Sequence, residues 1–173
     1  MMKVEWKGIG VVVVLVSLLA AAVIPLVMAA EGPGVIHCTV TTGVYSVTLD
    51  RTSVAYGQME EYDEKEDPLG TNYANNSGTL PEDLMIRGED AEGPEQTPQP
   101  TWTLGTEPGV DIYTHTFNAG TETSLTTDDQ TLAEDVIAGQ KVGFTLKLYT
   151  PTSIGTNGDY SFSVYVVAMA PEA

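Results

Sequence analysis

The sequence is short of basic residues. Seven Lys and Arg stand against 24 Asp and Glu, which gives a formal net charge of −17. Proteins that bind nucleic acids or anionic membrane surfaces neutralise phosphates with Lys and Arg, so this composition disfavours both partners. Such acidity is typical of a solvated extracellular surface, and divalent cations are the ligands that it would attract.

Cysteine is almost absent as well. Cys38 is the single one, so no disulfide within the chain can form and the fold must rest on its core. His37 stands beside Cys38, but neighbours in a strand point to opposite faces, so the two side chains would not converge on one metal ion. We interpret Cys38 as a buried, inert thiol, with an intermolecular disulfide as the alternative.

Catalytic motifs are also missing. The chain has no G-x-S-x-G elbow, no phosphate-binding loop and no His pair at zinc-ligand spacing. Its two histidines, His37 and His115, both lie in alternating segments, which indicates strand residues rather than catalysts. We therefore expect a protein that is not an enzyme and that carries no cofactor other than calcium.

One long apolar run, residues 9–30, follows Lys3 and Lys7. It is long enough to cross a hydrocarbon core of roughly 30 Å as a helix. With small residues before Ala30, it is typical of a cleaved secretory signal over residues 1–29. The alternatives are a retained anchor, and a pilin-type leader whose helix survives to pack inside a filament. We adopt the cleaved signal, which predicts an extracellular or cell-surface protein that touches a membrane only if the segment is retained.

Beyond this run the pattern changes to alternating β-branched and aromatic residues. Turn residues separate the segments with this pattern, which are residues 35–40, 44–49, 53–57, 80–88, 102–104, 112–117, 142–149 and 160–169. Roughly eight or nine short strands, spaced about ten residues apart, predict an all-β, immunoglobulin-like antiparallel β-sandwich over residues 44–173. The hydrophobic segment before it is the only predicted helix.

Two stretches interrupt the strand pattern. Residues 58–70 contain six acidic residues and one lysine, and so dense a charge block predicts a solvated loop. Residues 89–101 contain three prolines and four acidic residues, which predicts a long surface loop or linker.

Two kinds of candidate site lie in the turns. Oxygen ligands suited to calcium are offered by Asp128, Asp129, Asn157 and Asp159, although turn residues facing water are the competing interpretation. Asn75 begins the sequence Asn75-Asn76-Ser77, an acceptor motif for N-glycosylation in an exported chain.

Several strand segments resemble a known class of surface protein. They are Val47-Thr48-Leu49, Ser53–Gly57, Asn76–Thr79, Leu84–Ala91, Trp102-Thr103-Leu104 and Leu132–Met169 with AGQKVGFTLKLYTPTS at its centre. These segments resemble secreted immunoglobulin-like proteins of bacteria and archaea, and more distantly biofilm-fibre and camelysin-like subunits. In addition, GIGVVVVLVSLLAAA is similar to the start of archaeal pilins and archaellins. The resemblance implies an exported β-sandwich used at the cell surface and carries over no catalytic residue.

Residues 30–43 form a β-prone arm in front of the sandwich. Its strand character comes from Val35, Ile36, Cys38 and Val40. A freed arm could add to the open sheet edge of a neighbouring subunit, which is a known assembly mode for exported sandwiches. We therefore expect a homo-oligomer or polymer, as a filament or surface-layer subunit. The alternatives are a pilin-type subunit, and a surface module that binds carbohydrate or protein through loop aromatics such as Tyr62 and Tyr73.

Overall fold

Alternating apolar residues form the strands of residues 43–171, the part of the chain that the computed structural model describes. The strands are β1 (Val47–Leu49), β2 (Glu64–Glu66), β3 (Asn72–Asn76), β4 (Glu82–Gly88), β5 (Ala91–Glu92), β6 (Thr101–Leu104), β7 (Ile112–Asn118), β8 (Glu122–Ser124), β9 (Gln130–Val136), β10 (Lys141–Tyr149) and β11 (Val164–Met169). Residues 43–171 contain no helix that could cross a membrane. The predicted signal segment and the arm residues Val35, Ile36, Cys38 and Val40 lie outside the described residues.

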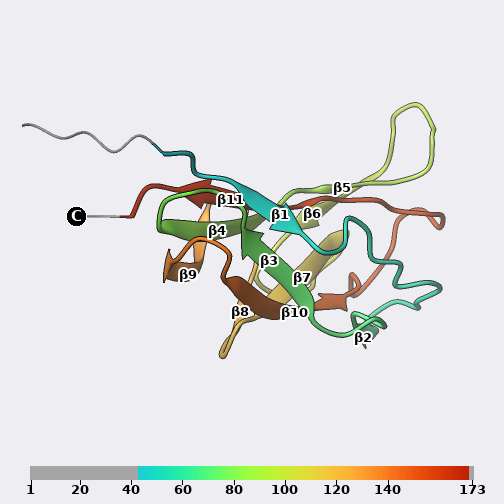
Figure 1. Ribbon diagram of the computed structural model, residues 1–173. Helices are drawn as coiled ribbons and strands as arrows, with labels where there is room; N and C mark the ends of the chain where they lie inside the picture. Colours follow the sequence, from blue (N-terminus) through green and yellow to red (C-terminus); the bar gives the residue numbers. More distant parts are fainter. Residues whose placement is uncertain (1–42, 172–173) are drawn as a thin grey trace, which may run out of the picture. The chain divides into compact units, whose positions relative to one another are not determined.

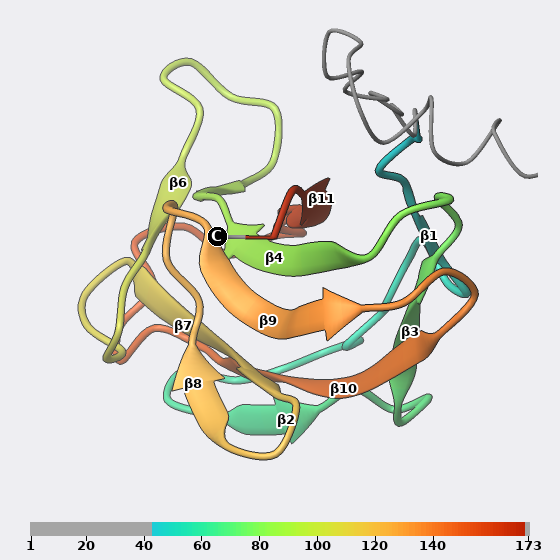
Figure 2. The ribbon, with the colours of Figure 1, turned by 60° about the vertical axis from the view of Figure 1, so that its left-hand side comes forward.

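The strands form two sheets (Figure 1). The larger sheet has eight strands in the order β1-β3-β10-β7-β6-β5, with β2 also paired to β10 and β8 to β7. The smaller sheet has three strands in the order β11-β4-β9, and Figure 2 shows β9 and β4 side by side. The prediction of an all-β fold is confirmed, and the two sheets are arranged as in a β-sandwich.

An apolar core lies between the two sheets. Phe144 and Leu146 of β10 meet Leu84 and Ile86 of β4, because every second residue of each strand turns inward. The buried residues of this first cluster are Ala74, Leu84, Ile86, Phe117, Leu125, Leu132, Val136, Phe144 and Leu146. A second cluster adjoins it towards the end of β10 and contains Tyr56, Ala91, Trp102, Tyr113 and Leu148.

The prediction of a purely antiparallel sandwich is wrong at one place, because β6 and β7 pair in parallel. The connection between them, residues 105–111, brings the chain back to a point beside Thr103. From there β7 runs in the same direction as β6, whereas after a hairpin it would run in the opposite direction. Backbone bonds hold this turn, with Thr103 N donating to Asp111 O at 2.9 Å and Gly105 N donating to Tyr113 O at 2.9 Å. A positive φ of 50° at Asp111 allows the sharp return.

The predicted acidic loop over residues 58–70 is partly structured. Its centre forms β2, which pairs with the second half of β10, so that Glu66 lies opposite Lys147. Lys147 Nζ also lies 3.1 Å from Glu64 Oε2. The strand forms despite its charge because alternate acids face a lysine of the partner strand. The predicted loop over residues 89–101 likewise contains β5, which pairs with β6.

The end of the sandwich where β3 turns into β4 is tightly closed. Asn76 is fully buried, and its Nδ2 donates to Leu80 O at 2.8 Å and to Val136 O at 2.7 Å. Its Oδ1 accepts a bond from Gly78 N at 2.8 Å. One side chain therefore ties the β3–β4 turn to the end of β9. We call this region the closed end.

Candidate functional site

A groove of about 1350 Å³ opens on one side of the sandwich, between residues 49–61 and residues 157–166. Its floor is formed by core side chains of β10 and β7, namely Phe144, Leu146, Leu148 and His115. Val54 lies on one wall, and Val164 and Val166 lie on the other. All three are only partly buried against the core, so the groove exposes apolar surface that a closed sandwich would cover.

Both walls of the groove have a strand pattern, but only the β11 part of the second wall belongs to a strand ladder. Ser53–Gly57 was predicted to be a strand, and Val54 and Tyr56 do alternate inward. Among the described residues, however, residues 51–61 make no backbone-to-backbone hydrogen bond. The opposite wall was predicted as one strand over residues 160–169, but β11 begins only at Val164. The first prediction is wrong, and the second is confirmed for residues 164–169 and wrong for residues 160–163, since a strand also needs a partner backbone beside it.

The outer edge of β11 is also open. Within residues 43–171 this strand pairs with β4 alone. Its sequence, VYVVAM, carries no charge. The opposite edge of the same sheet is β9, which carries Glu134 and Asp135 and whose register with β4 is irregular. Charges and bulges are the usual protection of a sheet edge against further pairing, so β9 is protected and β11 is not.

Aromatic side chains line the end of the groove towards residues 157–162. Tyr160 stacks on Trp102, with ring centroids 3.8 Å apart. Phe162 packs against the rings of Tyr113 and His115, at 4.9 Å and 5.1 Å. The aromatic cluster fixes residues 160–162 against the larger sheet, together with two backbone bonds between Glu92 and Ser161. The wall is therefore held by aromatic packing, by this bridge and by the pairing of β11 with β4, while the outer edge of β11 is unpaired within residues 43–171.

His115 is the buried titratable group of the groove floor. Its Nε2 lies 2.8 Å from the Tyr56 hydroxyl, while Nδ1 has no hydrogen-bond partner within residues 43–171. Burial lowers the pKa of His115 to about 4, against a weaker opposing effect of the Asp67 carboxylate. Burial also raises the pKa of Tyr56 far above its usual value. Both groups are therefore neutral near pH 7, and the prediction that His115 is a strand residue is confirmed by its place in β7.

Polar side chains fix both ends of the unpaired wall. Arg51 forms a two-pronged pair with the buried carboxylate of Asp67, at 3.0 Å and 3.3 Å, and also donates to Gly70 O. Further along, the Lys65 ammonium donates to Tyr56 O, and Thr150 Oγ1 donates to Glu60 O. The wall is thus held in place by side chains instead of by a neighbouring strand.

The predicted calcium ligands fall into two turns. Asp128 and Asp129 lie between β8 and β9, and Asp129 is 3.7 Å from the Arg87 guanidinium. Asn157 and Asp159 lie in the segment before β11, where they line the groove. No cluster of three or more acidic, His or Cys side chains suited to a metal ion occurs among residues 43–171. Calcium binding remains a prediction.

The predicted glycosylation residue, Asn75, is half-buried in β3. Its amide already bonds to the neighbouring strands, since Nδ2 lies 3.5 Å from Thr48 Oγ1, and the flipped amide would donate to Gly139 O and Gln140 O at 3.2 Å. A glycan on this nitrogen would replace those bonds. The next residue, Asn76, makes the stronger structural contacts, with three side-chain hydrogen bonds. The sequence indicated Asn76 only as a turn residue.

The chain matches no protein-family model, and no curated protein sequence matches it significantly. The site is therefore interpreted from its own geometry. That geometry is an apolar groove between two extended segments, each with an unsatisfied backbone edge.

Proposed function

We propose that this protein is a non-catalytic extracellular structural subunit that joins copies of itself by strand addition. The observation that carries the proposal is the open side of the sandwich, where β11 presents an uncharged edge beside partly exposed core residues. Edges of this kind pair with another strand unless they are protected. The joining element is the arm over residues 30–43, with the strand-like residues Val35, Ile36, Cys38 and Val40.

Export and an immunoglobulin-like sandwich belong to the same proposal. The apolar run over residues 9–30 and the net charge of −17 support an extracellular location, and the predicted partners are identical subunits in a filament or surface layer. The two-sheet arrangement of residues 47–169 supports the sandwich, and its one parallel strand pair distinguishes it from the simplest immunoglobulin topology.

Electron microscopy of the purified mature protein tests this function. We expect filaments or sheets whose formation depends on protein concentration. A chain that lacks residues 30–42 should remain monomeric, while its described domain keeps its fold by circular dichroism. Replacement of Ile36 and Val40 by Ser is a milder version that keeps the arm's length. Strictly monomeric behaviour of the intact mature chain at every concentration would contradict the proposal.

A pilin-type subunit is the alternative in which the apolar helix is retained and drives assembly. The N-terminal residue of the mature protein separates the two cases. A start near Ala30 supports strand addition, a start at Ile9 supports the pilin route, and a start at Met1 indicates an anchor.

A surface binding module is the second candidate function, favoured by two exposed tyrosines. The side chains of Tyr62 and Tyr73 are 74% and 41% exposed. Such rings can stack on sugars or pack against a protein partner. A glycan array probed with the mature domain tests this function, with the double variant Tyr62→Ala and Tyr73→Ala as the control for any hit.

A further inference from the structure

The groove runs between two extended segments, and we call the space between them the slot. Residues 52–59 form one wall and residues 160–166 form the other. On the first wall, alternate residues Val54 and Tyr56 face the interior, as in a strand, yet no backbone-to-backbone bond is made there within the described chain. On the second wall, Val164 and Val166 face the core while the outer edge of β11 is unpaired in the same range. A strand laid between them would satisfy both edges at once.

The floor of the slot suits an apolar strand face. Phe144, Leu146 and Leu148 lie beneath it, and all three are at least nine-tenths buried. A strand face of alternating apolar residues would cover the exposed parts of Val54, Val164 and Val166. Apolar surface withdrawn from water contributes about 25 cal/mol per Å², so closing the slot favours binding in addition to the new backbone bonds.

We propose that the slot receives residues 35–40 of a second copy of this chain, with Ile36, Cys38 and Val40 on the floor and Val35, His37 and Thr39 facing outward. This inference rests on the proposed function and adds to it the acceptor site and the face of the arm that enters. The segment VIHCTV has no Asp, Glu, Lys or Arg, unlike most of this acidic chain. Its more apolar face carries the side chains that the floor requires.

The position of the chain's entry point favours a second copy over the chain's own arm. Ser46 N donates to Glu82 Oε2 at 2.9 Å, and the adjacent residue of β4, Asp83, pairs with Met169. The beginning of β1 therefore lies at the last residues of β11, where β1 and β11 touch. The slot uses the opposite half of β11. The arm that precedes Gly43 would have to pass the contact between β1 and β11 to reach it.

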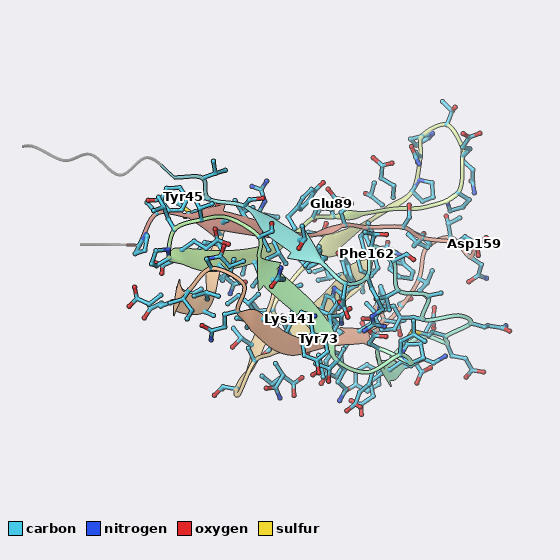
Figure 3. All side chains as sticks on the ribbon, in the orientation of Figure 1. Tyr45, Tyr73, Glu89, Lys141, Asp159 and Phe162 are labelled. Carbon is cyan, nitrogen blue, oxygen red and sulfur yellow. The ribbon has the colours of Figure 1, made fainter. Side chains whose placement is uncertain are left out.

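Figure 3 shows how these positions lie along the described domain. Tyr45, next to the entry point, is at one end, Asp159 is at the other, and Phe162 of the slot wall lies between them. Addition of each arm to the next slot would form a linear polymer with one interface type.

The single native cysteine allows a direct test by disulfide trapping. One chain keeps Cys38 as its only cysteine. A second chain of distinguishable mass carries Cys38→Ser and one new cysteine in the slot, at Val54 or Val166. The two chains are mixed in the mature form, assembled and oxidised. Because each chain has one cysteine, the cross-linked heterodimer can form only between two copies.

A matched control uses Val142→Cys in the Cys38→Ser background. Val142 is also partly buried against the first core cluster, but it does not line the groove. We expect the heterodimer in high yield for Val54→Cys and Val166→Cys, and at least tenfold less for Val142→Cys. Electron microscopy of each mixture before oxidation shows whether assembly occurs.

The outcomes test the slot and the proposed structural function separately. Filaments together with the Val54 and Val166 cross-links support the slot. Filaments with no cross-link above the Val142 control overturn the slot and leave the structural function standing. Absence of both filaments and cross-links overturns the structural function itself. A chain carrying Cys38 and Val54→Cys together checks the remaining case, since a disulfide within one monomer would show that the arm fills its own slot.

Discussion

The closed end and the slot are built from similar sequence patterns and differ in how their backbones are satisfied. At the closed end, Asn76 bonds both Leu80 O and Val136 O, and the strands around it are paired. Along the slot, residues 51–61 make no backbone-to-backbone bond within the described chain and rest on side-chain contacts. The comparison teaches that similar alternating segments are held by paired backbones at the closed end and by side-chain contacts along this wall of the slot.

The largest expected effect comes from removing the central side chain of the closed end. Asn76→Ala deletes three hydrogen bonds and removes this donor from the partly buried carbonyl of Leu80 and the buried carbonyl of Val136. We expect a loss of roughly 3 to 4 kcal/mol in the free energy of unfolding, measured by urea denaturation. Asn75→Ala is the matched control, because that amide is only half-buried and water can replace its bonds, so it should cost less than about 1 kcal/mol. Equal losses for both variants would show that the buried bonds of Asn76 contribute no more than those of a half-buried amide.

The second effect concerns acid and the floor of the slot. The pKa of His115 is about 4 in the folded protein, whereas an exposed histidine titrates near 6.5. The unfolded chain therefore binds the proton more readily, so stability is complete above about pH 6.5 and falls as the pH drops towards 4. A difference of this size corresponds to about 3 kcal/mol.

Two measurements check this pH dependence. NMR titration of the His115 ring should give a midpoint near pH 4, and a midpoint near 6.5 would show that the floor is hydrated. Urea denaturation between pH 7 and pH 4 should give a smaller change for His115→Gln than for the unchanged protein. The pKa of Glu89 is lowered below its usual value by its hydrogen bonds to Ser163 and Tyr165. The stability that this carboxylate contributes is therefore lost only as the pH falls through its lowered pKa.

The fold class could be predicted from the sequence because period-two alternation reports which face of a strand is buried. The segment around Leu84 and Ile86 and the segment around Phe144 and Leu146 became β4 and β10 for this reason. The pattern does not report pairing, since alternation is a property of one chain segment and a ladder requires two. Ser53–Gly57 shows this limit, with its side chains alternating and its backbone unpaired.

The candidate site was less accessible to prediction than the fold. The open edge of β11 follows from the strand order, which depends on contacts between segments far apart in the chain. The buried pair of Arg51 and Asp67 was hidden as well, because Asp67 looks like any other member of the acidic run over residues 60–67. The one available signal was the opposite charge of Arg51, and sequence spacing alone does not select its partner among six acids.

The third effect tests the anchor of the unpaired wall. Arg51→Ala removes the partner of a carboxylate whose side chain is 1% exposed. We expect a loss of about 2 kcal/mol in the free energy of unfolding, less than for a fully buried pair because the Arg51 side chain is itself 19% exposed. Arg51→Lys keeps the charge but not the two-pronged bond and should recover only part of the loss. Full recovery by lysine would mean that charge alone holds the wall.

The smallest effect comes from one hydroxyl group on that wall. Tyr56→Phe removes the bond to His115 Nε2 while keeping the ring in the second core cluster, so we expect a loss of about 1 kcal/mol by urea denaturation. Tyr62→Phe is the control, because its ring is 74% exposed, and it should leave stability unchanged.

Amide hydrogen exchange sharpens the comparison. In free subunits, the amides of residues 52–59 should exchange rapidly, because none of them donates a backbone-to-backbone bond within residues 43–171, whereas the paired amides of β3 and β10 should be protected. Once the slot is filled in the assembled protein, new ladder bonds should slow the exchange of residues 52–59. Unchanged rapid exchange after assembly would place the joining strand elsewhere on the sandwich.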